Sequence, residues 1–386
     1  MPNKKTFILG SGSSIGHSHG QFPSIVDFFS CAYELKLYNK ESFKEIGYFT
    51  KQLLGKNIFT KSIKLDVESL FTLIEIEIER NPNPKLLFIR DELLLLIRKV
   101  LTVLEENIEN DANIDNSEYD SLLKIIDNKD SIITFNWDTL LDNKLGRKEL
   151  LGKKHSNVNN DENNGEWKPR TDQYKKFIDE ISAFSGSTWK GLSVEEPYET
   201  WSSENGYYIK AHGSIDWYYC ANNSCRAFRK VFPVQSPLTH FFCSECHEKL
   251  SCLIIPPVLN KGYKNYPMIR KIWNIAAKEI STSSELVIWG YSLPPTDFHA
   301  NWLIRQARKG NLNAISIINP EVVNIKEGKS PQLRFGFIRK FYDLFRDILT
   351  KEKVFLFENF SDYKKKLDVI KKYPSLPLSS KQLKTL

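Results

Sequence analysis

Short apolar runs that end in glycine or polar turns recur along this sequence, and they restrict its fold more than any other feature. Six of them read as β-strands: Thr6–Leu9, Ser131–Phe135, Tyr207–Ala211, Leu253–Ile255, Leu286–Trp289 and Ala314–Ile318. Most of the longer stretches between them have helical periodicity. Strands that alternate with helices favour parallel pairing, because a parallel connection needs a long crossover. We therefore predict an α/β fold built on a parallel sheet.

The uneven spacing of these strands predicts how the chain is divided. About 120 residues separate the first two strands, which is too many for one crossover helix, and helical patterns occur there at Val67–Ile78 and Lys85–Leu104. We expect a helical insertion at about residues 40–128. A length of 386 residues suits one large domain or two smaller ones. We assign residues 1–330 to the main domain and 331–386 to a helical C-terminal extension.

The first strand ends in a glycine-rich loop, Gly10-Ser11-Gly12-Ser13-Ser14-Ile15-Gly16. Glycines directly after a buried strand allow backbone N–H groups to approach a pyrophosphate, and the next helix N-terminus favours its negative charge. The pattern indicates a Rossmann-type sheet with a dinucleotide site. Its spacing, G-x-G-x-x-x-G, differs from the G-x-G-x-x-G of dehydrogenases, so a structural tight turn is an alternative explanation.

Polar side chains also follow two other predicted strands. Asn136 and Asp138 come directly after the second strand, and His212 follows the third. Ligands of parallel sheets bind at the carboxyl ends of the strands, so we expect these side chains to meet the glycine loop there. Two structural alternatives stay open. Asn136 and Asp138 can serve as helix caps, and His212 can be a turn histidine beside a glycine.

Four of the six cysteines form two pairs, Cys220-x4-Cys225 and Cys243-x2-Cys246, with 17 residues between the pairs. Four thiolates at this spacing can surround one tetrahedral Zn²⁺, and a site with four protein ligands is structural. We predict a small zinc module at about residues 216–254. His247 and Cys252 lie close enough to act as substitute ligands. Such a module can also bind nucleic acid, and this alternative stays open.

In their order along the chain, these segments resemble sirtuins. Gly10-Ser11-Gly12-Ser13-Ser14 is similar to the family's glycine-alanine-glycine segment. Thr134-Phe135-Asn136-Trp137-Asp138 is similar to its threonine-glutamine-asparagine-x-aspartate segment, and His212-Gly213 to its histidine-glycine segment. A four-cysteine cluster follows, as in sirtuins. Segments similar to the family's later nucleotide-contacting segments then come at Ile255–Val258, Gly290–Leu293 and Ile318–Glu321. The resemblance covers roughly residues 5–325.

This resemblance implies that the chain binds NAD, with a structural Zn²⁺ in the cysteine module. The nucleotide contacts that it implies are Gly10, Ser11, Gly12, Ser13, Gly290, Ser292, Asn319 and Glu321. The catalytic residues would flank the nicotinamide ribose. His212 would act as a base toward a ribose hydroxyl or water, Asn136 would orient the attacking water, and Asp138 would bind the nicotinamide amide.

Departures from the family pattern favour NAD hydrolysis over deacylation. Phe135 stands where deacylating sirtuins have glutamine. Val258 is followed by Leu259-Asn260 and not by the phenylalanine-glycine-glutamate that frames a peptide groove. These departures resemble the NAD-consuming branch of bacterial anti-phage defence proteins. The expected activity is that of an NAD glycohydrolase (NADase), and protein deacylation, ADP-ribosyl transfer and a non-catalytic NAD or ADP-ribose sensor are alternatives.

Unregulated NAD hydrolysis would poison the cell that makes the enzyme. The resemblance therefore implies control by homo-oligomer assembly, or by a partner such as a HerA-type ATPase or an Argonaute-like protein. A net charge of +7 leaves nucleic-acid contact open. The apolar stretch Leu93–Leu104 is interrupted by Arg98 and Lys99, and the N-terminus lacks the apolar core of a signal peptide. We expect a cytoplasmic protein without a membrane span.

Overall fold

A computed structural model describes residues 4–37, 43–60, 63, 65–111, 117–127, 129–146, 206–228, 231–234, 241–255, 267–294, 297–320, 322, 337–345, 347 and 353–372. Outside the segment 44–125, the described helices are α1 (Ser11–His17), α2 (Phe28–Glu34), α7 (Leu140–Lys144), α10 (Pro267–Ser281), α11 (Phe298–Arg305), α13 (Phe337–Phe345) and α14 (Phe360–Lys372), with a 3₁₀ helix, η6, at Gln306–Lys309.

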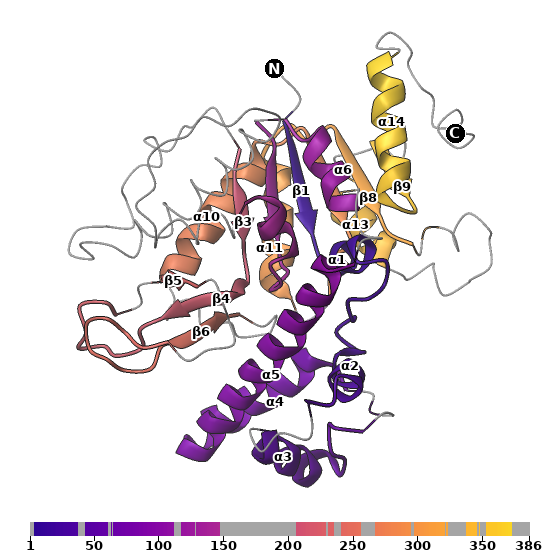
Figure 1. Ribbon diagram of the computed structural model, residues 1–386. Coiled ribbons are helices and arrows are strands. Elements are labelled where there is room, and N and C mark those ends of the chain that lie inside the picture. Colours follow the sequence, from indigo (N-terminus) through magenta and orange to yellow (C-terminus); the bar gives the residue numbers. More distant parts are fainter. Residues whose placement is uncertain are drawn as a thin grey trace.

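Six parallel strands form the main sheet, in the order β3-β2-β1-β7-β8-β9 (Figure 1). Their bounds are Lys5–Leu9 (β1), Ser131–Thr134 (β2), Tyr208–Lys210 (β3), Glu285–Trp289 (β7), Ala314–Ile318 (β8) and Val354–Phe357 (β9). Counted within the sheet, this order is 3-2-1-4-5-6, which is the Rossmann arrangement. The predicted fold class is confirmed.

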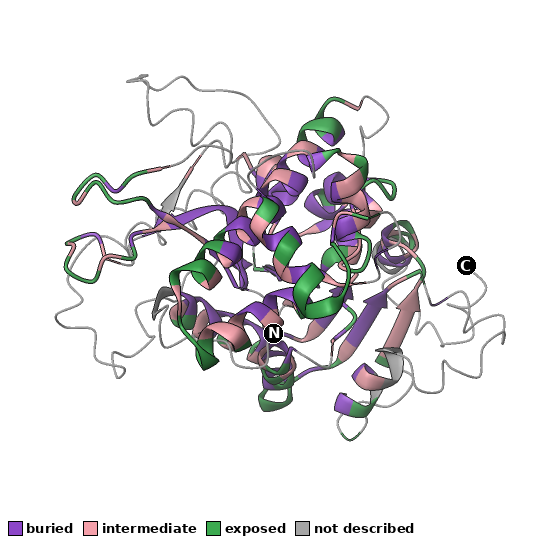
Figure 2. Cartoon of the chain, turned by 90° about the horizontal axis from the view of Figure 1, so that it is seen from below, coloured by how far each residue is buried: buried purple, intermediate pink, exposed green. Residues whose placement is uncertain are grey.

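The centre of the sheet is the core of the molecule. β1 pairs with β2 on one side and with β7 on the other, and Phe7, Ile8 and Leu9 are completely buried. The edge strand β9 is only half-buried (Figure 2). Because the strands of parallel sheets are covered on both faces, they appear in a sequence as continuous apolar runs. This is why five of the six strands could be predicted.

The predicted helical module is inserted between β1 and β2. It contains α3 (Lys44–Leu54), α4 (Val67–Arg80), α5 (Pro84–Glu109) and α6 (Glu118–Ile125). Side chains at the N-caps define where three of these helices begin, because Asp66, Asn83 and Ser117 each accept a backbone N–H three residues ahead. Figure 1 shows α3, α4 and α5 beyond the end to which the arrow of β1 points. The insertion therefore covers the carboxyl ends of the strands.

One predicted strand belongs to a different sheet. Leu253–Ile255 was expected in the parallel sheet, but β6 (Ser251–Ile254) pairs antiparallel with β4 (Gly213–Tyr219). β5 (Val231–Pro233) completes this three-stranded sheet on the other side of β4. The prediction was wrong because an apolar run shows that a strand is buried but does not show its direction.

The region predicted as a helical extension, 331–386, contains a strand as well as helices. Residues 354–357 form β9, which pairs in parallel with β8 and extends the main sheet at its edge. The described helices of this region are α13 and α14, and α14 packs against β8, β9 and α6. Residues 354–372 are therefore part of the main α/β structure.

Within the described ranges, no helix is both long enough and apolar enough to cross a membrane. The longest described helix, α5, has 26 residues, but Glu92, Arg98 and Glu105 are among its buried side chains.

Candidate functional site

One pocket lies at the carboxyl ends of β1, β2, β3 and β7. The segments that follow these strands line it with Gly10, Ser11, Ser14, Phe135, Asn136, Trp137, Asp138, His212, Gly290, Tyr291, Ser292, Pro294 and Asp297. The helical insertion contributes Val67, Glu68 and Leu101, and the segment from α1 to α2 contributes Phe22, Pro23, Ser24, Ile25 and Phe28. In a Rossmann-type sheet the ligand crevice lies where the strand order reverses, which is between β1 and β7 here. The pocket occupies this position.

The predicted site residues divide into two groups. The first group lines the pocket and consists of Gly10, Ser11, Asn136, Asp138, His212, Gly290 and Ser292. Gly12 and Ser13 are not among the lining residues; of the predicted loop only Gly10 precedes α1, and these two residues lie in the first turn of that helix. Asn319 follows β8 and is tied to the edge of the sheet, where its backbone N–H donates to the carbonyl of Phe357. Glu321 lies outside the described residues.

The glycine loop packs tightly against the segment that follows β7. The N–H of Gly12 donates to the carbonyl of Gly290 at 2.9 Å. A Cβ atom on Gly12 would lie 2.7 Å from the Cα of Gly290, and Gly290 itself has φ +64°. Close backbone packing therefore explains these two glycines, as the alternative of a structural tight turn expects. Gly290 also lines the pocket.

Ser14 joins the two polar residues that follow β2. Its hydroxyl donates to Oδ2 of Asp138 at 2.7 Å and accepts from Nδ2 of Asn136 at 2.9 Å. The same Asn136 nitrogen also donates to the carbonyl of Gly10 at 3.0 Å. Burial raises the pKa of the Asp138 carboxyl, whereas the charge of Lys210 opposes this increase. Asn136 and Asp138 are thus fixed to the glycine loop by side-chain contacts.

A helical residue supports this arrangement from behind. Tyr119, on α6 of the insertion, is almost completely buried, and its hydroxyl lies 3.0 Å from the hydroxyls of both Ser13 and Ser14. Burial raises the pKa of its phenol, so Tyr119 is neutral. The insertion therefore takes part in positioning the residues of the pocket.

His212 is enclosed by aromatic rings and lies beside a carboxylate. Its ring centroid is 4.8 Å from that of Phe135 and 6.1 Å from that of Trp273. Its Nε2 is 3.4 Å from Oδ2 of Asp297, and both side chains are almost completely buried. Asp297 also caps α11, because its Oδ1 accepts the N–H of Ala300 at 3.1 Å. The backbone next to His212 is fixed as well, since Gly213 has φ +74° and a Cβ there would lie 2.1 Å from the carbonyl oxygen of Leu253.

A buried ion pair lies beneath the site. Lys210, at the end of β3, has no exposed surface, and its Nζ is 2.8 Å from Oδ2 of Asp142. The same Nζ donates to the backbone carbonyl of Asp138 at 2.5 Å. Tyr208 donates to the Asp142 carboxylate at 2.8 Å. This network joins β3 to the segment after β2 and fixes the backbone of Asp138.

The ionisable groups of the pocket are mainly acidic. Glu68, Asp138 and Asp297 line it, and the described lining residues include neither lysine nor arginine. Opposite charges attract more strongly where water is excluded. The pocket therefore suits a ligand group that is positively charged or that becomes positively charged during a reaction.

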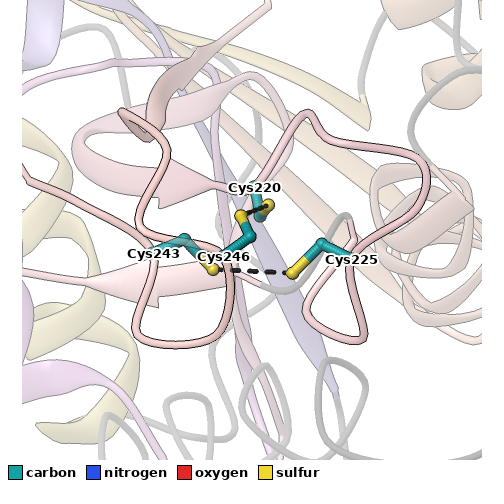
Figure 3. A group of neighbouring side chains, drawn as sticks. All are labelled: Cys220, Cys225, Cys243 and Cys246. Carbon is teal, nitrogen blue, oxygen red and sulfur yellow. Dashed lines mark hydrogen bonds between the residues drawn. The ribbon is translucent and has the colours of Figure 1, made fainter.

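The four cysteines of the predicted zinc module are brought together (Figure 3). The sulfur atoms of Cys220 and Cys246 are 3.7 Å apart, and so are those of Cys225 and Cys243. All four sulfurs lie within 4.8 Å of one another. Tetrahedral Zn–S bonds of roughly 2.3 Å give sulfur separations of about 3.8 Å. The cluster therefore fits one zinc ion, and neither His247 nor Cys252 belongs to it.

Sequence reasoning missed several residues that hold the site together. Ser14 was visible only as part of the glycine-rich segment, and no pattern linked Asp297 to the site. Tyr119 and Lys210 gave no signal, because a tyrosine in an amphipathic helix and a lysine in a strand are both ordinary. Their roles depend on contacts between segments 72 to 124 residues apart.

No protein-family model matches the chain, and no curated protein matches it significantly. Solved structures with a similar arrangement include a Sir2 homologue in complex with NAD, which is 12% identical, covers 97% of this chain and 92% of its own, and has a TM-score of 0.38. A mutant Sir2 homologue bound to ADP-ribose is 13% identical, with coverages of 98% and 96% and a TM-score of 0.37. A Sir2 complex with a p53 peptide and NAD⁺ is 12% identical, with coverages of 96% and 93% and a TM-score of 0.32. At these sequence identities and TM-scores, structural similarity establishes neither the family nor the activity of this chain.

Proposed function

We propose that this protein binds NAD in the pocket between β1 and β7 and hydrolyses its nicotinamide–ribose bond to give nicotinamide and ADP-ribose. The observation that carries the proposal is the convergence of Asn136, Asp138 and His212 on one pocket at the switch point of a Rossmann-type sheet. Dinucleotides bind at this place in such sheets. Asp138 also accepts the N–H of Leu140 at 3.2 Å, as the helix-cap alternative expects, but capping accounts for neither Asn136 nor the convergence of all three residues.

The charge of the pocket supports cleavage at the nicotinamide end of NAD. The nicotinamide ring of NAD is cationic, and it leaves as a neutral molecule while positive charge develops on the ribose, as in glycoside hydrolysis. Carboxylates at Glu68 and Asp138 stabilise such charge. The aromatic rings of Phe135 and Tyr291, with centroids 4.6 Å apart, add an apolar wall.

Each of the three central residues has a distinct role in the proposed reaction. His212 accepts a proton from water or from a ribose hydroxyl, which makes the oxygen a better nucleophile. Nδ2 of Asn136 is bound to Gly10 and Ser14, so its amide oxygen is the group that orients the water. Asp138 accepts a hydrogen bond from the nicotinamide amide. The water oxygen then forms a bond to C1′ as the bond from C1′ to nicotinamide breaks.

The cysteine cluster has a structural role in this proposal. Cys220, Cys225, Cys243 and Cys246 would hold Zn²⁺ with no ligand position left for a substrate. They lie next to the antiparallel sheet, whose strand β4 begins directly after His212. Zinc binding would therefore stabilise the segment that presents His212.

The proposal extends to biological control. An enzyme that depletes NAD harms its own cell, so we infer that activity depends on homo-oligomer assembly or on a separate partner protein, in a defence response such as that against phage. Light scattering of the purified protein, alone and with candidate partners, tests this extension. A monomer with full activity under every condition would contradict it.

The direct test is release of nicotinamide from NAD by purified protein, followed by chromatography. Wild type should release nicotinamide, whereas His212→Ala and Asn136→Ala should release about 10²–10⁴-fold less, the usual contribution of general-base catalysis. His19→Ala and Asn143→Ala are the matched controls, since neither residue lines the pocket. Tight NAD binding without cleavage would instead favour a sensor, and cleavage only with an acyl-lysine peptide would favour deacylation.

A further inference from the structure

A carboxylate, that of Asp297, lies against the imidazole of His212. It lies after β7, 85 positions from His212 along the chain, and the two side chains meet where both face the pocket. Their side chains are only 3% and 1% exposed. A carboxylate placed this close to an imidazole in a site removed from water interacts strongly with the proton on the nearer nitrogen.

The geometry identifies that nitrogen. Nε2 of His212 is 3.4 Å from Oδ2 of Asp297, so a proton on Nε2 lies close to a negative charge. Catalytic hydrogen bonds are often long before a ligand binds and shorten in the complex. In the neutral ring with Nε2 protonated, Nδ1 is the nitrogen that carries no proton. The tautomer of a histidine is set by the partner of one nitrogen, and this defines which nitrogen acts as the base.

Asp297 is itself held in place by two further contacts. The hydroxyl of Tyr291 donates to Oδ2 at 3.0 Å, and the N–H of Ala300 donates to Oδ1 at 3.1 Å. Tyr291 in turn stacks on Phe135, whose ring also touches His212. The carboxylate therefore cannot turn away from the imidazole without breaking the cap of α11.

We propose that Asp297 is a positioning residue for His212: its carboxylate keeps the proton on Nε2 and stabilises the imidazolium that forms when Nδ1 accepts a second proton. The role in catalysis rests on the proposed NAD hydrolysis, whereas the control of the tautomer does not. Asp297 acts through His212 and is not assigned a contact with the substrate. Its function as a helix cap is separate from this role and can be preserved by substitution.

The test uses ¹⁵N NMR of the histidine rings in the full-length protein, with the His212 signals assigned from the spectrum of His212→Gln. Wild type should show His212 with the proton on Nε2. Asp297→Asn and Asp297→Ser both retain an N-cap oxygen but remove the charge, so the proton should shift toward Nδ1. Asp130→Asn is the matched control: Asp130 is also buried and accepts backbone N–H groups, but it lies at the opposite end of the sheet.

Activity gives the second measurement. The two Asp297 variants should lower kcat at least about tenfold, but by no more than His212→Ala does. Their KM should change little. An unchanged His212 tautomer in both variants, or the same change in Asp130→Asn, would overturn the proposal. If wild type releases no nicotinamide, the proposed function fails, and the NMR result still decides whether Asp297 controls His212.

Discussion

Replacing Lys210 with methionine tests whether the buried ion pair holds the site together. The substitution keeps the length and apolar stem of the side chain but leaves the Asp142 carboxylate, which is 1% exposed, without its cation. It also removes the contacts of Nζ with Asp142 and with the carbonyl of Asp138. Breaking one side of a buried pair costs about 3–5 kcal/mol, because an uncompensated charge remains in the interior. We expect the free energy of unfolding to fall by this amount at neutral pH.

The pH dependence of this loss gives a sharper test. Burial raises the pKa of Asp142, and the nearby carboxylate of Asp216 acts in the same direction. Without Lys210 the folded protein should bind a proton at Asp142 at a pH where the unfolded chain does not. A carboxyl whose pKa is higher in the folded state loses stability as pH rises above its unfolded value. The variant should therefore be closest to wild type in acid and furthest from it at neutral pH.

Guanidinium denaturation followed by tryptophan fluorescence, at about pH 5 and pH 7.5, measures both effects. The double variant Lys210→Met with Asp142→Asn is the matched control, because it removes the second charge as well. It should recover a large part of the lost stability. A loss below about 1 kcal/mol in the single variant, or no recovery in the double variant, would refute the reasoning, because the pair would then behave as a surface pair.

Three further predictions concern the glycine loop, the polar network and the cysteine cluster. Gly290→Ala places a Cβ 2.2 Å from the backbone nitrogen of Ser13, at a residue with φ +64°. NAD binding measured by calorimetry should therefore be lost or greatly weakened. Gly20→Ala is the control and should retain binding, because a Cβ at Gly20 has no atom within 4 Å. Ser14→Ala leaves Asp138 and Asn136 without their shared partner, so nicotinamide release should fall about tenfold while the melting temperature changes little; an unchanged rate would show that Ser14 does not position them. Purified protein should contain one zinc ion per chain by atomic absorption. Cys243→Ser should lose the zinc and lower the stability of the protein, whereas Cys31→Ser should keep it. A wild-type protein that contains no metal and is as stable without added zinc as with it would contradict the structural role.

The main sheet could be predicted because its strands are buried on both faces. Phe7, Ile8 and Leu9 form a continuous apolar run, and the glycine that follows marks the end of the strand. The edge strand β9 was missed, because Val354–Phe357 lies in a lysine-rich segment and is only half-buried. Strand β4 was missed for another reason. It follows His212 directly, and its mixture of polar and aromatic residues has no clear apolar run.

The pocket was predictable in outline and not in detail. Asn136, Asp138 and His212 could be placed together because each follows a predicted parallel strand, and the carboxyl ends of such strands share one edge. The supporting contacts could not be placed. Tyr119 reaches the site from a helix whose position no local pattern specifies. Lys210 lies in a predicted strand, but no pattern indicated that its partner would be Asp142 of α7. The glycines illustrate a related limit. Their spacing indicated a phosphate loop, and the packing of Gly12 on Gly290 accounts for them without a ligand.

The central claim is that water attacks the ribose of NAD with His212 as the base, and single-turnover product analysis tests it most directly. Protein in excess over NAD is quenched at intervals, and nicotinamide, free ADP-ribose and protein-bound ADP-ribose are quantified together. We predict equal amounts of nicotinamide and free ADP-ribose from wild type and neither product from His212→Ala. Nicotinamide without free ADP-ribose would indicate transfer to another acceptor, and full turnover by His212→Ala, or no cleavage by wild type, would contradict the claim.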